Sequence, residues 1–99
     1  MKIYKPTNTR TRVRAGIAFL NAVNPNWKKK IKLGRLDLSN SRTCVIGEVY
    51  GDYGDGMEKL GIGALSDSAI ALGFKEDGVF DKNYPLLTKI WKQELKKIL

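Results

Sequence analysis

The sequence predicts a compact all-α single domain of four or five helices. Apolar residues recur at helical spacings of three and four, capping residues precede these segments, and no convincing pair of strands is present. A chain of 99 residues with 42% hydrophobic content can bury one core, so residues 1–99 are expected to form one domain. Residues 1–8 include Pro6 and have no apolar period, and we expect them to be a flexible arm.

The first helix is expected to begin after Asn8 or Thr9, because both residue types are favourable N-caps. Gly16 lies inside it, where either another backbone packs closely or the glycine is simply tolerated. Pro25 ends the helix, because proline disfavours helical backbone in the residue before it. The apolar face of this helix comprises Val13, Ile17, Leu20 and Val23.

A short second helix is expected after Pro25, with Trp27 and Ile31 pointing inward and Gly34 as the residue that follows its end. Further along the chain, Ser66 should cap a short helix over residues 67–72, with Gly73 after it. The last helix covers about residues 84–98, and its expected apolar face comprises Leu87, Ile90, Trp91, Leu95 and Ile98.

The central stretch of residues 41–60 has two interpretations. Apolar residues recur there at helical spacing without a break in phase, which favours one helix packed against the first and last helices. Its four glycines within ten positions weaken a helix, so residues 51–56 could instead form a loop between two short helices. In the single-helix interpretation, a stripe of glycines would admit another helix or a second copy of the chain: Gly47, Gly51 and Gly54.

The net charge of +8 is concentrated in the first part of the chain. Residues 1–42 hold eleven basic residues and one acid, whereas residues 43–99 hold seven basic residues and nine acids. A half-chain of this charge attracts anionic partners, although a solvated basic surface is the simpler explanation. With Trp27 or Tyr4 available for stacking, the candidate contacts to an anion or nucleic acid are Arg10, Arg12, Arg14, Lys28, Lys29, Lys30, Lys32 and Arg35.

Several chemistries are excluded by composition. The chain has no histidine and one cysteine, which removes histidine-dependent nucleophilic catalysis and a zinc site within one chain. Cys44 is expected to be a small buried residue, although a helix N-terminus can activate a thiol. The acids Asp52, Asp55 and Glu58 would share a helical stripe, which we interpret as solvated surface. No catalytic residue, metal or cofactor is therefore predicted.

A helix-turn-helix was also considered for residues 68–80, which have suitable small and apolar residues at the turn spacing. Its second helix would contain Glu76, Asp77 and Asp81, and these acids would be repelled by DNA phosphates. The basic part of the chain is the better candidate for nucleic-acid binding.

The segments LDLS, TCVIGEVYGDYGDGMEKLG, ALGF and YPLLTKIWKQEL together resemble a family of short uncharacterised bacteriophage and actinobacterial proteins. The resemblance covers roughly residues 13–95, and this chain is richer in lysine than the family pattern. It implies a phage or prophage setting, in which small proteins bind host factors, nucleic acid or signalling nucleotides. It implies no enzymatic activity.

These observations predict a small, basic, non-enzymatic binding module for an anionic partner, most simply nucleic acid. One alternative is a protein-interaction module for an acidic surface, such as a phage inhibitor or adaptor of a host protein, with a homodimer formed through the glycine stripe. Another is a pocket for a small anionic nucleotide-like ligand. No signal peptide or membrane-spanning run is present, so a cytoplasmic location is expected.

Overall fold

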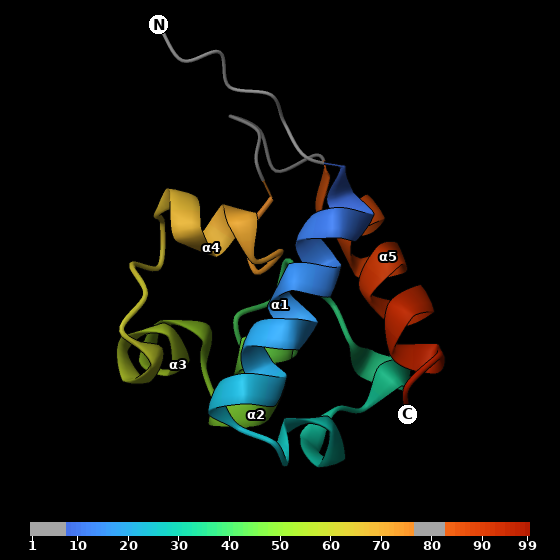
Figure 1. Cartoon of the computed structure of the whole chain (residues 1–99), viewed down its shortest axis with the longest axis horizontal. Helices are drawn as coiled ribbons and strands as arrows, with labels where there is room; N and C mark the ends of the chain where they lie inside the picture. Colours follow the sequence, from blue (N-terminus) through green and yellow to red (C-terminus); the bar gives the residue numbers. More distant parts are fainter. Residues whose placement is uncertain (1–7, 77–82) are drawn as a thin grey trace, which may run out of the picture.

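The computed structural model describes residues 8–76 and 83–99 of the chain (Figure 1). Within these two ranges the chain forms five α helices and two short 3-10 helices, and no β strand. The prediction of a compact all-α fold is confirmed. The expected arm at residues 1–8 lies outside the described residues except for Asn8, which caps the first helix.

Helix α1 (Thr9–Val23) begins and ends where the sequence predicts. The side chain of Asn8 accepts a hydrogen bond from the Thr11 N–H at 3.2 Å, which satisfies one of the unpaired donors of the first turn. Val13 and Leu20 are fully buried, as expected. Val23 was expected on the same buried face but is exposed, because it is the last residue before the chain turns away.

The segment after Pro25 is tighter than the predicted helix. It forms a single 3-10 turn, η1 (Trp27–Lys30), followed by a second one, η2 (Leu33–Arg35). Trp27 is fully buried and its indole N–H donates to the Asn21 side chain at 2.9 Å. The prediction that Gly34 follows a helix end is wrong, because Gly34 lies inside η2.

The prediction of one helix over residues 41–60 is wrong. The structure has two short helices there, α2 (Val45–Tyr50) and α3 (Tyr53–Leu60). Gly51 separates them with a φ of 96°, a conformation that favours glycine, and the Asp52 side chain then accepts from the Asp55 N–H to start α3. The alternative of a loop over residues 51–56 is also too long, because most of that span is helical.

The apolar spacing continues through this break because each short helix buries apolar residues of its own, Ile46 and Val49 on α2 and Met57 on α3. Helices α2 and α3 then pack against each other closely. A Cβ atom added to Gly56 would overlap Cγ2 of Ile46, so a glycine is needed where the two helices meet. The expected packing of this stretch against the first and last helices is replaced chiefly by packing of α2 against α3 and η1.

Helix α4 (Asp67–Ala71) has both predicted boundaries nearly in place. Ser66 accepts a hydrogen bond from the Ala69 N–H at 3.3 Å. At the other end, Gly73 has a φ of 71° and the Phe74 N–H donates to the Ala69 carbonyl at 3.0 Å. These contacts form the left-handed glycine ending that the sequence indicates.

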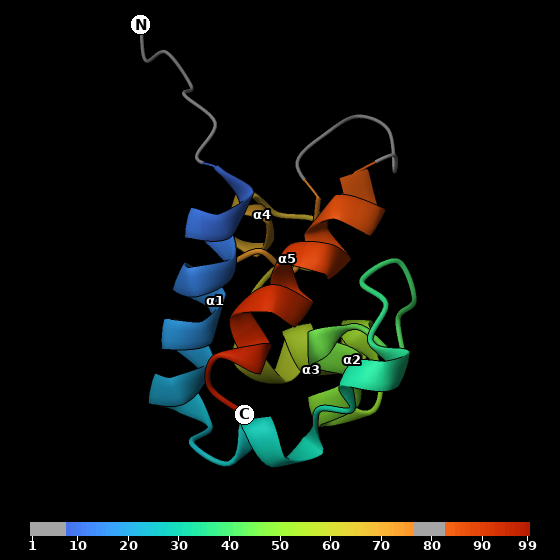
Figure 2. The same cartoon turned by 90° about the vertical axis from the view of Figure 1, so that its right-hand side faces the viewer.

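Helix α5 (Tyr84–Lys96) lies beside α1 (Figure 2). Trp91 is buried at their junction, where its indole N–H donates to the Gly73 carbonyl at 2.6 Å. A Cβ atom on Gly16 would overlap the Leu72 carbonyl oxygen and lie 3.1 Å from Trp91. Gly16 is therefore required by a close backbone approach, which decides between the two interpretations of this residue. Ile98, expected on the apolar face of α5, is exposed because it lies beyond the end of the helix.

Candidate functional site

Positive charge is concentrated on three elements that the sequence does not place together. Helix α1, η1 and α5 with the adjoining Lys97 carry ten basic side chains and one acid, Glu94. Helices α3 and α4 together carry three acids and one basic residue. Because α3 and α4 lie on the opposite side of the molecule from α5 (Figure 1), the charge is segregated. We call the side formed by α1, η1 and α5 the basic side.

The most organised part of the basic side is a group of five side chains, the Glu94 cluster. Arg10 donates from Nη1 to Glu94 Oε2 at 2.6 Å and from Nη2 to Gln93 Oε1 at 2.7 Å. Arg14 donates from Nε to Glu94 Oε1 at 2.8 Å, and Lys97 donates from Nζ to Glu94 Oε2 at 2.9 Å. Two residues one turn apart on α1 thus meet three residues from the C-terminal part of α5.

Glu94 carries its negative charge beneath its partners. The hydrogen bonds from Arg14 and Lys97 lower the pKa of Glu94 to about 2, so the carboxylate is ionised at neutral pH. Its side chain is only 7% exposed, whereas the side chains of Arg10, Arg14 and Lys97 are 34%, 59% and 57% exposed. One carboxylate neutralises one of three cations, so the exposed surface of the cluster keeps a charge of +2.

Two of the arginines predicted to contact an anion, Arg12 and Arg35, bind other residues of the protein and do not belong to the Glu94 cluster. Arg12 is buried and donates from Nη2 to Thr9 Oγ1 at 3.3 Å, so it does not lie on the surface as a phosphate contact would. Arg35 donates from Nε to Glu48 Oε2 at 2.9 Å, while the Lys32 N–H donates to the other oxygen at 2.7 Å. Arg35 and Glu48 therefore fasten η2 to α2.

The predicted lysine run forms an exposed turn. Lys29, Lys30 and Lys32 are exposed and Lys28 is half-buried. Among residues 8–76 and 83–99, no ion pair involves these four side chains. The end of α5 and η1 lie toward the same end of the molecule (Figures 1 and 2), so the lysine turn and the end of α5 bring positive charge to that end.

Stacking of a base by the predicted aromatic residues has no support in the described structure. Trp27 is fully buried in the core, where its ring contacts other apolar residues and its indole N–H donates to Asn21. Its ring is therefore not exposed to a nucleic-acid base. Tyr4 lies outside the described residues. The basic side therefore presents charge and hydrogen-bond donors, which are features suited to phosphate contacts.

The three glycines of the expected helix-packing or dimer stripe do not lie on one stripe. Gly47 is buried inside α2. A Cβ atom at this position would overlap the Ser41 carbonyl oxygen and lie 2.7 Å from Arg42 Cα, so the position requires a glycine. Gly51 forms the turn between α2 and α3, and Gly54 is exposed in α3. Their spacing of four and three residues reflects a local backbone contact, a turn and a surface position, so they do not form a stripe on a single helix.

Cys44 is a buried structural residue, as expected. It caps α2, where its sulfur accepts from the Gly47 N–H at 3.3 Å and donates to the Ser41 carbonyl at 3.7 Å. Burial raises the pKa of the Cys44 thiol, which opposes activation as a nucleophile. Asp52 caps α3, and within the described parts of the chain no group of three potential metal ligands is present.

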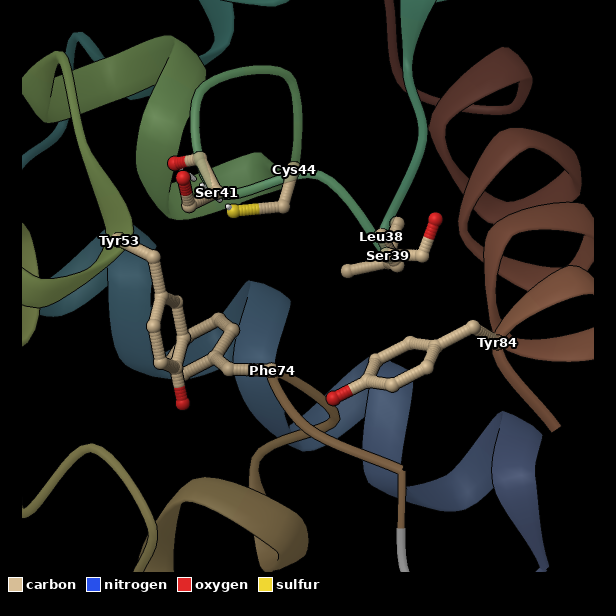
Figure 3. A pocket seen from close by; sticks show the side chains of 7 residues that line it. All are labelled: Leu38, Ser39, Ser41, Cys44, Tyr53, Phe74 and Tyr84. Atoms are coloured by element: carbon tan, nitrogen blue, oxygen red, sulfur yellow. Dashed lines mark hydrogen bonds between the residues drawn. The ribbon is translucent and has the colours of Figure 1, made fainter. Parts of the chain in front are cut away.

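A small pocket of about 110 Å³ was not predicted (Figure 3). Tyr53 and Tyr84 flank it, and the Tyr53 hydroxyl donates to the Ala64 carbonyl oxygen. Burial, with Tyr84 nearby, raises the pKa of Tyr53 to about 12, so this hydroxyl stays neutral. The pocket is lined by Leu38, Ser39, Ser41, Cys44, Tyr53, Phe74 and Tyr84.

This pocket does not suit a nucleotide. Ligand pockets usually enclose about 300–1,000 Å³, and none of the lining residues is basic. Its residues come from four separate segments, so no local pattern in the sequence could have indicated it. This pocket is therefore not the predicted anionic-ligand pocket, which stays a prediction.

Only the first part of the helix-turn-helix pattern at residues 68–80 lies within the described residues. Helix α4 is present, but Lys75 and Glu76 are not helical, and residues 77–82 lie outside the described residues. In the described ranges, no helix has the length and apolar character needed to cross a membrane.

The residues that sequence reasoning missed are on α5. From the sequence, the four lysines at positions 89, 92, 96 and 97 are ordinary residues of the solvent-facing side of the last helix, and nothing local marks Gln93 or Glu94. The available signal was the one-turn spacing of Arg10 and Arg14, which indicates a shared partner without saying where it lies. Comparison of the chain with protein-family models, curated proteins and solved structures finds no significant match.

Proposed function

We propose that this protein is a non-enzymatic binding module for a polyanion, most simply the phosphate backbone of nucleic acid. The observation that carries the proposal is the segregation of charge. Apart from the buried Arg12, nine basic side chains and one acid lie on α1, η1 and α5 with the adjoining Lys97, against three acids and one basic residue on α3 and α4. Charge that served only solubility would not need to be separated from the acids in this way. Segregated charge raises the local concentration of an anionic partner and orients it.

The mode of binding follows from the kinds of side chain on the basic side. Arginine and lysine contact phosphate oxygens regardless of base sequence, and these contacts release counterions. The lysine turn and the Glu94 cluster supply such groups at separate places on one side. We therefore expect binding driven by the backbone, with little preference for sequence and a strong dependence on salt.

The test is fluorescence anisotropy with labelled single strands and duplexes of about 20 nucleotides, from about 30 to 300 mM KCl. If about five phosphates are contacted, the logarithm of the duplex binding constant should fall against the logarithm of salt with a slope of about −4 to −5. No binding at the lowest salt, or binding without a salt slope, would end the proposal. In that case an acidic protein surface, as for a phage inhibitor or adaptor, becomes the partner to test.

A matched pair of variants separates the basic side from net charge alone. Lys29→Glu on η1 and Lys59→Glu on α3 make the same change in charge at exposed positions on different sides of the molecule. Lys29→Glu should weaken low-salt binding about 10-fold, and Lys59→Glu less than about 2-fold, because ion contacts weaken with distance and screening. Equal losses would show that only net charge matters.

A further inference from the structure

The Glu94 cluster retains hydrogen-bond donors that its own carboxylate does not use. Arg14 donates to Glu94 from Nε only, and in the described part of the chain neither of its terminal nitrogens is bound to an acceptor. Lys97 uses one of its three N–H groups on Glu94. Gln93 accepts from Arg10 through Oε1, and its amide NH₂ group can donate. Three residues thus offer donors at the same surface.

The positions of these donors are set before any ligand arrives. Glu94 lies beneath the cations and holds Arg10 from one oxygen and Arg14 from the other. Helices α1 and α5 pack against each other, and the Trp91 side chain of α5 lies against Gly16 of α1. Side chains fixed in this way lose less conformational entropy when they bind, which favours affinity.

The charge and shape of the cluster suit phosphate. Its excess of +2 exceeds the single negative charge of one backbone phosphate, so the cluster attracts such a group. A planar guanidinium can bind two phosphate oxygens at once, and lysine adds a point charge. Donors come from both α1 and the end of α5, so more than one oxygen of a phosphate group can be contacted.

We propose that the Glu94 cluster is a phosphate-binding site, in which Arg14 and Lys97 contact one phosphate group and Glu94 acts as the positioning residue. The inference rests on the proposed function for the source of that group, a nucleic-acid backbone. Free phosphate has the same chemistry, so the experiment has an arm for each source.

The first arm compares variants that remove one charge from the basic side. Arg14→Gln should weaken oligonucleotide binding at low salt about 10-fold, whereas the control Lys29→Gln should weaken it about 2- to 3-fold. Arg14→Lys keeps the charge but loses the planar donor pair, and should recover only part of the affinity. If Arg14→Gln costs no more than Lys29→Gln, or Arg14→Lys restores binding fully, the site is refuted while the proposed function stands.

The second arm titrates inorganic phosphate against chloride at equal ionic strength, with the side-chain N–H signals of Arg14 and Gln93 followed by NMR. Saturable shifts with phosphate alone, absent in Arg14→Gln, are the expected result. If these shifts occur and no oligonucleotide binds, the site stands with free phosphate as its source and the proposed function fails. If neither probe binds, both proposals fail. Melting of each variant, followed by circular dichroism, shows that it is folded.

Discussion

Two glutamates with buried side chains hold basic segments in this molecule, and they do so with different results. Glu48 on α2 binds the Arg35 side chain and the Lys32 backbone N–H, so one carboxylate meets one cation. Glu94 on α5 binds three cations and leaves two positive charges in excess. The first arrangement joins two elements of the fold, whereas the second also presents charge at the surface. An ion pair alone therefore does not identify a site, and the proposed site rests instead on the excess of cations around one carboxylate.

The largest expected difference is between Gly16, on the α1 helix that carries partners of Glu94, and Gly34, in the η2 turn held by Glu48. The two positions should differ in how they tolerate an added methyl group. Gly16→Ala places a Cβ against the Leu72 carbonyl and Trp91, and should lower the free energy of unfolding by about 2–3 kcal/mol. Gly34→Ala in η2 meets open space at an ordinary φ, and should leave stability unchanged or raise it by up to about 1 kcal/mol. Urea denaturation checks both. Equal effects would contradict the close junction of α1, α4 and α5.

Removing each carboxylate sharpens the comparison directly. Glu94→Gln should lower the free energy of unfolding by about 1–2 kcal/mol, because three cations lose their shared anion and solvent screens part of the loss. Glu48→Gln should cost about 1 kcal/mol or less, since an amide oxygen can still accept from the Lys32 N–H. A larger loss at Glu48 would show that the number of cations does not decide the difference.

The contribution of Glu94 should also depend on pH. Its pKa is lowered from 4.5 to about 2 on folding, so the stabilisation is present above about pH 4.5 and is lost as pH falls toward 2. The difference in unfolding free energy between the wild type and Glu94→Gln should therefore shrink between about pH 5 and about pH 3. A difference that stays constant over this range, measured by urea denaturation at each pH, would contradict the assigned ionisation.

The smallest expected effect is that of the Arg35→Gln substitution on oligonucleotide binding. Arg35→Gln removes a charge that Glu48 already neutralises, so oligonucleotide affinity at low salt should change by less than about 2-fold. The matched Arg14→Gln variant removes a charge from the cluster that has an excess. Anisotropy measurements of oligonucleotide affinity on both variants compare the cation bound by Glu48 with a cation bound by Glu94. A loss at Arg35→Gln as large as at Arg14→Gln would move the ligand surface away from the Glu94 cluster.

Much of the fold was predictable because its signals are local. Asn8 and Ser66 cap the helices that the apolar spacing predicts, and Gly73 ends α4 in the left-handed conformation. The single helix over residues 41–60 was wrong because Gly51 and Asp52 interrupt the helical backbone while the apolar spacing of the sequence continues. Spacing alone cannot distinguish a helix from two helices joined in phase.

The candidate site was less predictable because its residues are distant in sequence. Arg10 and Arg14 lie 84 and 80 residues from Glu94, so only the packing of α1 against α5 brings them together. The small pocket could not be predicted for the same reason, because its lining residues are distant in sequence. Composition indicated a basic N-terminal half correctly, but it could not show that Arg12 is buried, that Arg35 is paired with Glu48, or that the lysines of α5 lie on the same side.

The most direct test of the central claim is the salt dependence of duplex binding for three proteins: wild type, Arg14→Gln and Arg35→Gln. The account predicts a steep slope for the wild type, a slope smaller by about 1 for Arg14→Gln, and an unchanged slope for Arg35→Gln. The lost unit corresponds to one phosphate contact made by Arg14. Identical slopes for all three proteins, or no salt dependence in the wild type, would contradict the claim that the excess charge around Glu94 is where this protein holds its anionic partner.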